Sequence, residues 1–397
     1  MNVTIGCLGR FHAFDLAREL DALGELERIY TSYPRTQAPR FGLDPARVTG
    51  WPWHELFNRG LQRLASLVPG LDHRAAACEA FDRAVCAALR PGSDVFLGWS
   101  GSSLRSLARA RELGMLAVVE RGSTHILHQH ELMTAEYERR GVRGRLAHPA
   151  TVERELAEYE LADRIAVPTR HVARTFLERG VDPHKLIQVP YGVDLTRFQS
   201  EDGERGDGFE VVFCGNLSMR KGVPLLLEAF QRLKRPDARL TLVGPPSPET
   251  KELLASWPDA RVRAVGRVPQ EELVRYYQRA HVFCLPSLEE GLAMVLAQAM
   301  AMGLPVVATS ESGAEELVER GRQGLLVPAR DVGALAEALQ HLSDDPELRR
   351  AQGEAARQRV QSGHSWSDYG RRVSAAYHDA LAERAEPCVP ATYRRSA

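Results

Sequence analysis

A glycine-containing turn with two basic side chains could bind phosphate. It follows an apolar strand pattern at 209–213, contains Gly215 and Asn216, and brings Arg220 and Lys221 to the start of a helical pattern. Unpaired backbone N–H groups and the positive end of the helix dipole favour an anion there. The alternative is a pair of solvated basic residues, but cations at a helix start oppose the dipole. Only four of the 51 basic residues are lysines, so Lys221 indicates that a compact charge is wanted at this turn.

An acidic turn within 281–309 could bind the hydroxyls of a ligand. The order is a strand, a Pro-Ser turn, Glu289 and Glu290, Gly291, an amphipathic helix, a Gly-Leu-Pro turn and a second strand. A carboxylate before a helix start can accept hydrogen bonds from ligand hydroxyls, and Gly291 would let a ligand approach the backbone. Gln298 lies eight residues after Glu290, about two turns, so we expect both along one helix face. The alternative is that the two glutamates only cap the helix.

Two loops in the first half follow apolar strands, and a loop at the carboxyl end of a parallel strand faces the crevice of such a fold. The first loop, 9–12, reads Gly-Arg-Phe-His, and its alternative is an ordinary βα turn. The second, 120–126, contains Arg121, Ser123 and His125. A lone histidine is more often structural, but one in a predicted cleft loop with these neighbours can donate to a ligand hydroxyl. We therefore interpret His125 as functional.

Strands and helices are needed to position these residues. Short apolar runs alternate with segments of helical period from end to end, which predicts an α/β fold of parallel strands joined by crossover helices. The predicted strands are 3–8, 26–31, 94–98, 115–119, 164–167, 186–189, 209–213, 239–243, 262–265, 281–285, 305–309 and 324–327. The predicted helices include 14–23, 102–114, 152–161 and 223–233. The alternation restarts after residue 208, so the sequence predicts two similar sheets.

The polar, Gly-rich stretch 199–208 has the composition of a linker. We therefore place one domain at 1–198 and a second at 199–364. The segment 365–384 carries aromatic and aliphatic residues at spacings of three and four, which predicts a helix that packs back on the first domain. The tail 385–397 is expected to be frayed.

Composition excludes several classes of protein. The chain has 397 residues with 51 Lys+Arg against 52 Asp+Glu, a formal charge of −1, so no global field draws it to nucleic acid. Its 44% hydrophobic content is enough for two packed cores and argues against disorder. The six cysteines are scattered without a CxxC pair, which favours a reducing compartment. With no signal-peptide pattern and no 18-residue apolar stretch, we expect a cytoplasmic protein.

The sequence resembles the family 4 glycosyltransferases. The resemblance rests on the Arg-Lys-Gly turn at 220–222, on Pro-Ser-x-x-Glu-Gly at 286–291 with a polar residue eight positions after the glutamate, and on the Ala-Met-Ala-x-Gly-Leu-Pro-Val that follows. It extends over about residues 1–380 and is weakest at 36–92. It implies the GT-B architecture, in which two Rossmann-like domains with parallel sheets face a central cleft. It also implies a retaining transferase for a nucleotide sugar that the second domain mainly binds.

The resemblance assigns roles to individual residues. Catalytic roles fall on His125, Glu290 and Lys221. Acceptor binding falls on Phe11, His12, Arg121 and Ser123. Donor binding falls on Gly9, Arg10, Gly215, Asn216, Arg220, Lys221, Val268, Glu290, Gly291, Leu292, Ala293, Met294 and Gln298.

Three positions depart from the family pattern. Gln298 stands where the family usually has a glutamate that binds both ribose hydroxyls, and an amide can accept one hydrogen bond and donate another. Asn216 stands where many relatives have a second phosphate-binding arginine, for which Arg220 could substitute. The Gly-Leu-Ala at 291–293 replaces the commoner Gly-Phe-Gly.

The chemistry implied by the resemblance needs no cofactor. No Asp-x-Asp motif occurs, so we expect no metal and expect basic side chains and a helix dipole to stabilise the departing nucleoside diphosphate. The acceptor hydroxyl would attack from the leaving-group face, and a donor phosphate oxygen would take its proton. Alternatives are a nucleotide-sugar epimerase of the same fold and a protein that binds a nucleotide sugar without turning it over.

The acceptor stays open between a glycan, a lipid-linked glycan and a small metabolite. Residues 57–68 put arginines and apolar side chains on different faces, and Arg139, Arg140, Arg143 and Arg145 gather near a predicted cleft edge. Basic amphipathic stretches can dock on anionic membranes, but they are more often solvated faces of packed helices. The predicted partners are a nucleotide-sugar donor and a hydroxyl acceptor, with peripheral membrane contact as an option and nucleic acid excluded.

Overall fold

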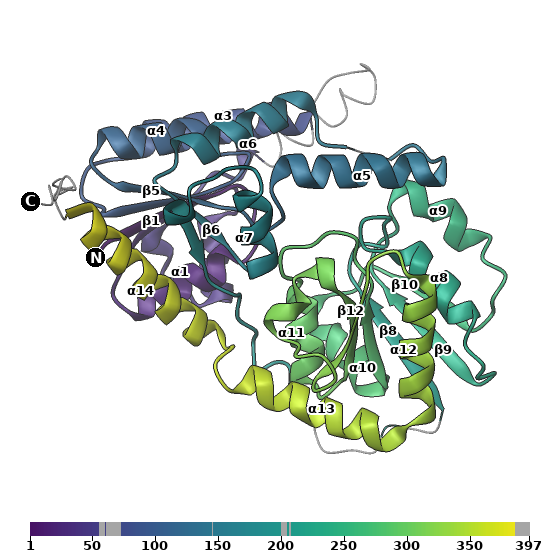
Figure 1. Cartoon of the computed structure of the whole chain (residues 1–397). Coiled ribbons are helices and arrows are strands. Elements are labelled where there is room, and N and C mark those ends of the chain that lie inside the picture. Colours follow the sequence, from purple (N-terminus) through teal and green to yellow (C-terminus); the bar gives the residue numbers. More distant parts are fainter. Residues whose placement is uncertain (55–59, 61–72, 145, 200–204, 206–207, 386–397) are drawn as a thin grey trace, which may run out of the picture. The chain divides into compact units, whose positions relative to one another are not determined.

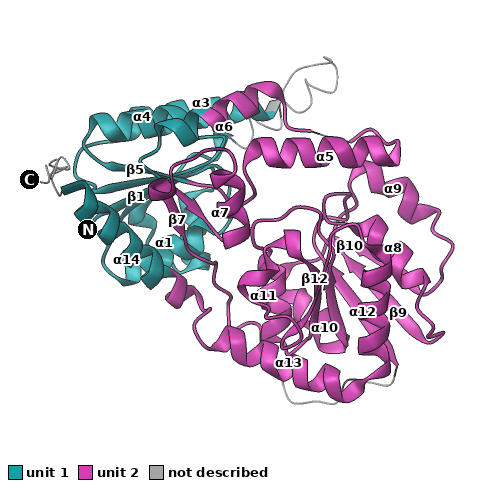
Figure 2. Ribbon diagram, in the orientation of Figure 1, with its two compact units in different colours: residues 1–119, 157–164, 370–397 teal, residues 120–156, 165–369 magenta. Residues whose placement is uncertain are grey.

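The computed structural model describes residues 1–54, 60, 73–144, 146–199, 205 and 208–385 (Figure 1). The chain forms two compact units (Figure 2). Unit 1 comprises residues 1–119, 157–164 and 370–397, and unit 2 comprises 120–156 and 165–369. Among the described helices, none is both long and apolar enough to cross a membrane.

The first sheet has seven strands in the order β3-β2-β1-β4-β5-β6-β7. Their bounds are β1 Val3–Cys7, β2 Leu26–Thr31, β3 Val48–Gly50, β4 Val95–Trp99, β5 Leu116–Glu120, β6 Arg164–Val167 and β7 Leu186–Gln188. The residues of β1, β4 and β5 are buried throughout, as expected for parallel strands covered by helices on both faces.

The helices of this half lie between its strands, as crossover connections require. They are α1 Ala13–Ala22, α3 His73–Ala88, α4 Leu104–Glu112, α5 Ile126–Arg140, α6 Pro149–Leu161 and α7 Arg170–Leu177. Short 3₁₀ turns occupy Arg35–Phe41, Pro45–Arg47 and Pro183–Lys185.

The second sheet has six strands in the order β10-β9-β8-β11-β12-β13. They are β8 Phe209–Cys214, β9 Ala238–Val243, β10 Val262–Gly266, β11 Val282–Leu285, β12 Val306–Thr309 and β13 Gly324–Val327. The helices are α8 Val223–Gln231, α9 Pro248–Ala255, α10 Leu273–Arg279, α11 Met294–Ala301, α12 Val332–Asp344 and α13 Pro346–Gln361. The strand order reverses between β8 and β11, and ligands of such sheets bind beyond the carboxyl ends of strands at this point.

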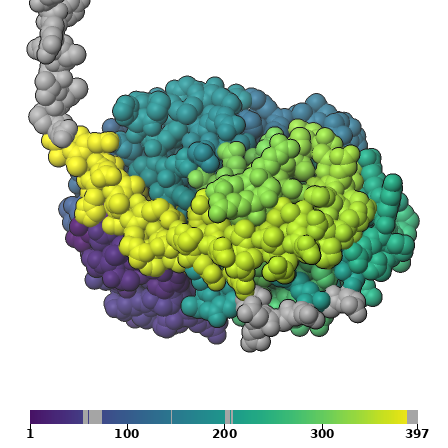
Figure 3. All heavy atoms as spheres, turned by 60° about the horizontal axis from the view of Figure 1, so that its bottom comes forward, coloured from purple at the N-terminus to yellow at the C-terminus, as the bar shows by residue number. Residues whose placement is uncertain are grey.

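The C-terminal helix α14, Trp366–Ala385, begins in unit 2 and continues in unit 1 from Gly370. In unit 1, His378 Nε2 lies 2.8 Å from Glu25 Oε1, and Arg384 donates to the carbonyl of Gly114. Figure 3 shows this helix, in yellow, on the surface beside the N-terminal segment in purple. The predicted domain boundary near residue 198 lies between β7 and β8. The sequence-based domain bounds remain a prediction, because the compact units divide the chain differently.

The predicted α/β fold with two parallel sheets is confirmed. Each of the twelve predicted strands has a counterpart whose ends agree within one residue. The sequence analysis missed β3, because three residues are too short to show a period of two.

Candidate functional site

The basic turn before α8 is pressed against the loop that follows β11. Gly222 has φ +69°, and a Cβ at this position would lie 1.8 Å from the carbonyl oxygen of Pro286. Leu288 donates its backbone N–H to the carbonyl of Arg220 at 2.8 Å. Only glycine fits at residue 222, because the conformation is left-handed and the backbones are too close for a side chain. This approach brings the basic turn to the two glutamates.

Lys221 and Glu290, which the sequence assigned to the diphosphate and to the sugar, form a direct ion pair. Both side chains are buried. Burial, followed by the charge of Arg220, lowers the pKa of the Lys221 ammonium to about 7, while the Glu289 carboxylate acts in the opposite direction. The pair therefore places one cation at the start of α8 and one carboxylate before α11, so that an anion and a hydroxyl could each find a partner there.

Glu289 belongs to the acidic turn that the sequence predicts to bind a ligand, with helix capping as the alternative, but no role was predicted for this residue by itself. Its carboxylate is fully buried and accepts hydrogen bonds from the backbone N–H and hydroxyl of Thr124, from Gln129 and from Arg220. Burial alone would raise its pKa, but Arg220 and these hydrogen bonds outweigh it and lower the pKa to about 2. The signal in the sequence was the first carboxylate of the Glu-Glu pair, but no residue near it in the chain indicated its partners.

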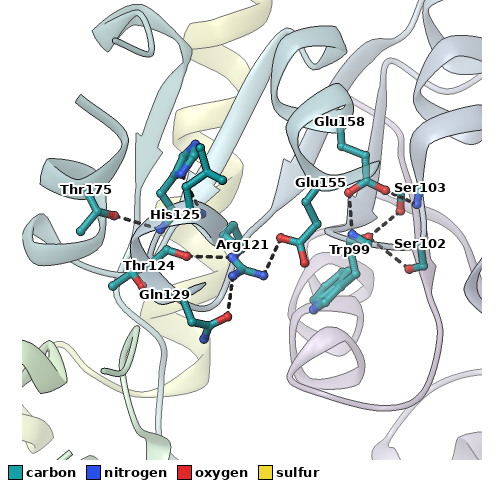
Figure 4. Close-up of polar contacts among 12 residues, drawn as sticks. Trp99, Ser102, Ser103, Arg121, Thr124, His125, Gln129, Glu155, Glu158 and Thr175 are labelled. Carbon is teal, nitrogen blue, oxygen red and sulfur yellow. Dashed lines mark hydrogen bonds and ion pairs between the residues drawn. The ribbon is translucent and has the colours of Figure 1, made fainter. Parts of the chain in front are cut away.

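His125 lies at the N-cap of α5, and Figure 4 shows it beside Arg121, Thr124 and Thr175. Its Nδ1 accepts a hydrogen bond from the backbone N–H of Leu127, so the proton of a neutral ring is on Nε2. Its backbone N–H donates to the Thr175 hydroxyl at 3.0 Å. Burial, then the charges of nearby arginines, lowers the pKa of the imidazole to about 4, so the ring is uncharged at neutral pH.

Arg121 is held by the protein itself. Its guanidinium pairs with Glu155 at 2.7 Å and donates to the carbonyl of Thr124 and to Gln129 (Figure 4). Both side chains of the ion pair are nearly buried. The contacts seen therefore shape the turn that holds His125, and the predicted acceptor contact of Arg121 remains a prediction. Ser123 is half-buried in the same turn.

Gly291 allows two protein backbones to meet. A Cβ on Gly291 would lie 2.1 Å from the carbonyl oxygen of Gly122, and the hydroxyl of Thr169 donates to the Gly291 carbonyl at 3.1 Å. We had expected this glycine to make room for a ligand. Along the Cβ direction the space is taken by the protein instead, so a glycine is required here for packing.

The expectation that Glu290 and Gln298 share a helix face was wrong. Helix α11 begins at Met294, so Glu290 lies in the non-helical loop before it. Gln298 is on the helix, buried, and its amide oxygen accepts from the Tyr277 hydroxyl at 3.3 Å. Of the intervening donor candidates, Leu292 and Ala293 are buried, whereas Met294 is exposed.

The other predicted donor residues of unit 2 are less enclosed. Gly215 has φ +144°, Asn216 is exposed and Val268 is half-buried. Of the arginines considered for membrane contact, Arg139 and Arg140 are paired with Glu136, and Arg145 lies outside the described residues. The stretch 57–68, apart from Gly60, lies outside them as well.

The loop after β1 belongs to unit 1. Gly9 has φ +98° and donates its N–H to the Ser32 hydroxyl, and the Arg10 guanidinium lies 4.6 Å from the centre of the Phe41 ring. Phe11 is exposed, with φ +39°, while His12 is buried beside Trp99. In the part of the chain that the structure describes, no group of three or more His, Cys, Asp or Glu side chains is placed to hold a metal ion.

Comparison with known sequences identifies glycosyltransferases. Residues 208–345 match the family of group 1 glycosyl transferases. A D-inositol 3-phosphate glycosyltransferase from Kribbella flavida is 32% identical over 255 residues, which are 58% of this chain and 60% of that protein. A putative colanic acid biosynthesis glycosyltransferase from Salmonella typhimurium is 28% identical over 368 residues, covering 85% of this chain and 86% of the relative. The chain thus aligns with about 60% of the first relative and with most of the second.

Comparison with solved structures agrees with the fold. Sucrose-phosphate synthase from Thermosynechococcus elongatus matches with a TM-score of 0.66 at 20% identity, covering 96% of this chain and 100% of that one. The Anabaena protein HepE in complex with UDP-glucose matches with a TM-score of 0.69 at 15% identity, with the same coverage. At these identities the likeness establishes the architecture alone.

Proposed function

We propose that the chain is a group 1 glycosyl transferase, which moves a sugar from a nucleoside-diphosphate sugar to a hydroxyl acceptor. Residues 208–345 match that family, and the chain has the GT-B fold. The observation that carries the proposal is the buried contact between Lys221 and Glu290 at the start of α8. A nucleotide-sugar donor presents a diphosphate and hydroxyls side by side, and this pair offers a partner for each. A solved relative holds UDP-glucose, which supports a donor of this class.

In the proposed mechanism, the donor diphosphate displaces the Lys221 ammonium from Glu290. Lys221 and Arg220 then stabilise the charge that develops on the departing nucleoside diphosphate. Glu290 accepts hydrogen bonds from sugar hydroxyls, and the neutral His125 donates from Nε2. The reaction retains the anomeric configuration, uses no metal, and lets a donor phosphate oxygen take the acceptor's proton. We further propose that the protein acts in the cytoplasm.

The alternative of binding without turnover is favoured by one observation. The amide oxygen of Gln298 already accepts a hydrogen bond from Tyr277, so Gln298 has less capacity to accept hydrogen bonds from a ligand than a free glutamate would have. Release of nucleoside diphosphate that depends on an added hydroxyl acceptor distinguishes the transferase from such a binder.

The first experiment is a thermal-shift screen with UDP-, GDP- and ADP-sugars, because a ligand that binds only the folded state raises the melting temperature. The donor that stabilises the wild type is then used to measure turnover. We expect Lys221→Ala to lower turnover at least ~10²-fold, the scale of losing one charge-stabilising donor.

Lys251→Ala is the matched control, because this lysine is exposed on α9 of the same unit. It should keep wild-type turnover. Near-normal turnover in Lys221→Ala, or no shift with any of the three classes of donor, would refute the proposed function.

A further inference from the structure

A single buried carboxylate, that of Glu289, binds residues from two other segments of unit 2. Glu289 Oε1 accepts from the backbone N–H of Thr124 at 2.9 Å and from its hydroxyl at 2.8 Å. Oε2 accepts from Gln129 Nε2 at 2.7 Å and from Arg220 Nη1 at 3.1 Å. Thr124 directly precedes His125, and Arg220 directly precedes Lys221. In each of these two segments, Glu289 therefore contacts the residue directly before a proposed catalytic residue.

On the Arg220 side, the contacts fix one edge of a guanidinium and leave the other available. Nη1 donates to the side chain and to the carbonyl of Glu289 and lies 3.7 Å from Glu290 Oε2. The remaining guanidinium N–H groups bond to none of the described residues, and the side chain is 32% exposed. Arginine suits such a position, because its planar fork can bind a carboxylate on one edge and a phosphate on another.

On the Thr124 side, the contacts fix the start of α5. Thr124 is completely buried, and its backbone N–H and its hydroxyl both donate hydrogen bonds to Glu289. The next residue, His125, is the N-cap of the helix. Gln129, one turn further along, donates to Glu289 and accepts from Arg121. The residues on both sides of His125, Thr124 and Gln129, are thus bound to a carboxylate that lies 164 positions after His125 in the sequence.

We propose that Glu289 is a positioning residue, which holds Arg220 toward the donor diphosphate and sets the turn that carries His125. The inference rests on the proposed function and extends it to a residue that contacts neither sugar nor phosphate. A buried carboxylate is costly when it serves structure alone, because apolar side chains can fill the same space without losing solvation. Here the charge of the Glu289 carboxylate is paired with the Arg220 guanidinium, a cation that the proposed reaction needs.

The test compares Glu289→Gln, Arg220→Gln and the double variant, using nucleoside diphosphate release from whichever of UDP-, GDP- or ADP-glucose the wild type consumes. Glutamine keeps the size of the side chain but cannot accept from Gln129, Thr124 and Arg220 together. We expect turnover in Glu289→Gln to fall at least about tenfold, because small misplacements of charge-stabilising groups are costly in the transition state. The Kd of the nucleoside diphosphate that this donor releases should change less than about threefold, because the binding cations remain.

The double variant separates positioning from a general loss of structure. Because Glu289 acts partly through Arg220, its removal has a smaller effect once Arg220 is gone, so the double variant loses less turnover than the product of the two single losses. The loss that remains beyond that of Arg220→Gln measures the effect of Glu289 on the turn that carries His125. Glu136→Gln is the matched control, because Glu136 is also buried, accepts from Arg139, Arg140 and Arg330, and contacts none of the proposed site residues. It should keep wild-type turnover even where it loses thermal stability.

Three results would overturn the inference. One is turnover within twofold of wild type in Glu289→Gln, and another is a double variant whose loss equals the product of the two single losses. If Glu289→Gln does not fold, Glu289→Asp replaces it, because the shorter side chain keeps the charge but moves it away from Arg220. Wild-type turnover in Glu289→Asp is the third result that would overturn the inference. A wild type that consumes no donor overturns the proposed function as well, so the two failures are distinguishable.

Discussion

His125 uses its two ring nitrogens for different purposes. Nδ1 accepts from the backbone of α5, whereas Nε2 carries the proton that we assign to the donor sugar. His125→Asn should keep the helix cap, because an asparagine oxygen can replace Nδ1, but it removes the Nε2 donor. We expect His125→Asn to lose turnover about 10²-fold with a melting temperature close to wild type. His125→Ala should lose both the Nε2 donor and the helix cap. We expect the same loss of turnover and, in addition, a decrease of about 1 kcal/mol in the free energy of unfolding.

The same residue makes stability depend on pH. The pKa of His125 is lowered to about 4 in the folded protein, against about 6.5 in the unfolded chain, so the unfolded state binds the extra proton between these values. The contribution of His125 to stability is therefore complete above pH 6.5 and is lost as the pH falls toward 4, by about 3 kcal/mol in all. Urea unfolding of wild type and His125→Asn at pH 7 and pH 4.5 measures it. Equal pH dependence in the two proteins would contradict the assignment.

The sequence predicts roles for Lys221 and Glu290 because each stands in a local pattern that has a chemical meaning. Glu289 has no such pattern. Its partners Thr124 and Gln129 come from a segment about 160 residues earlier, and only the fold shows that they meet. The packing reason for glycine at residue 291 could not be predicted either, because the atom that excludes a side chain belongs to Gly122. Contacts between distant segments are what a single sequence does not contain.

At the scale of elements, the N-terminus of α4 is held by two carboxylates. Asp82, on α3, accepts from the backbone N–H groups of Arg105 and Ser106 and from the Ser106 hydroxyl, and Glu158 accepts from the N–H groups of Gly101 and Ser103. These N–H groups have no partner inside the helix, and the acidic charges also favour the helix dipole. The sequence predicted this helix but not its caps, since neither carboxylate is adjacent to it in the chain.

Asp82→Ala should therefore destabilise the protein strongly. Loss of three hydrogen bonds to a buried charged group predicts a decrease of about 3 kcal/mol in the free energy of unfolding, while Asp82→Asn, which keeps one acceptor, should lose roughly half of that. Glu112→Ala is the control, because Glu112 is exposed at the other end of α4. Chemical denaturation measures all three variants. A loss in Glu112→Ala equal to that in Asp82→Ala would show that the caps are unimportant.

At the scale of the whole molecule, the order of elements was predictable and the division into units was not. Alternating apolar runs and helical segments predict two parallel sheets, because the hydrophobic pattern of each strand and helix lies within its own residues. The compact units depend on how the chain returns. It leaves unit 1 at Val119, passes through it again at 157–164, and ends in it from Gly370 onward. Such returns depend on packing between helix faces that are far apart in the sequence.

The chain re-enters unit 1 at Gly370, where the lack of a side chain lets helix α14 pack closely against helix α1. A Cβ on Gly370 would lie 2.4 Å from the Cβ of Glu19 on α1, so α14 lies against α1 more closely than any other residue would allow. Gly370→Val should push the two helices apart and lower the free energy of unfolding by about 2 kcal/mol, the usual scale of overpacking. Ala375→Val adds the same side chain at an exposed position of α14 and should change stability by less than about 0.5 kcal/mol. If calorimetry gave both variants the same melting temperature, the close contact between α1 and α14 would not be what holds the C-terminal helix in unit 1.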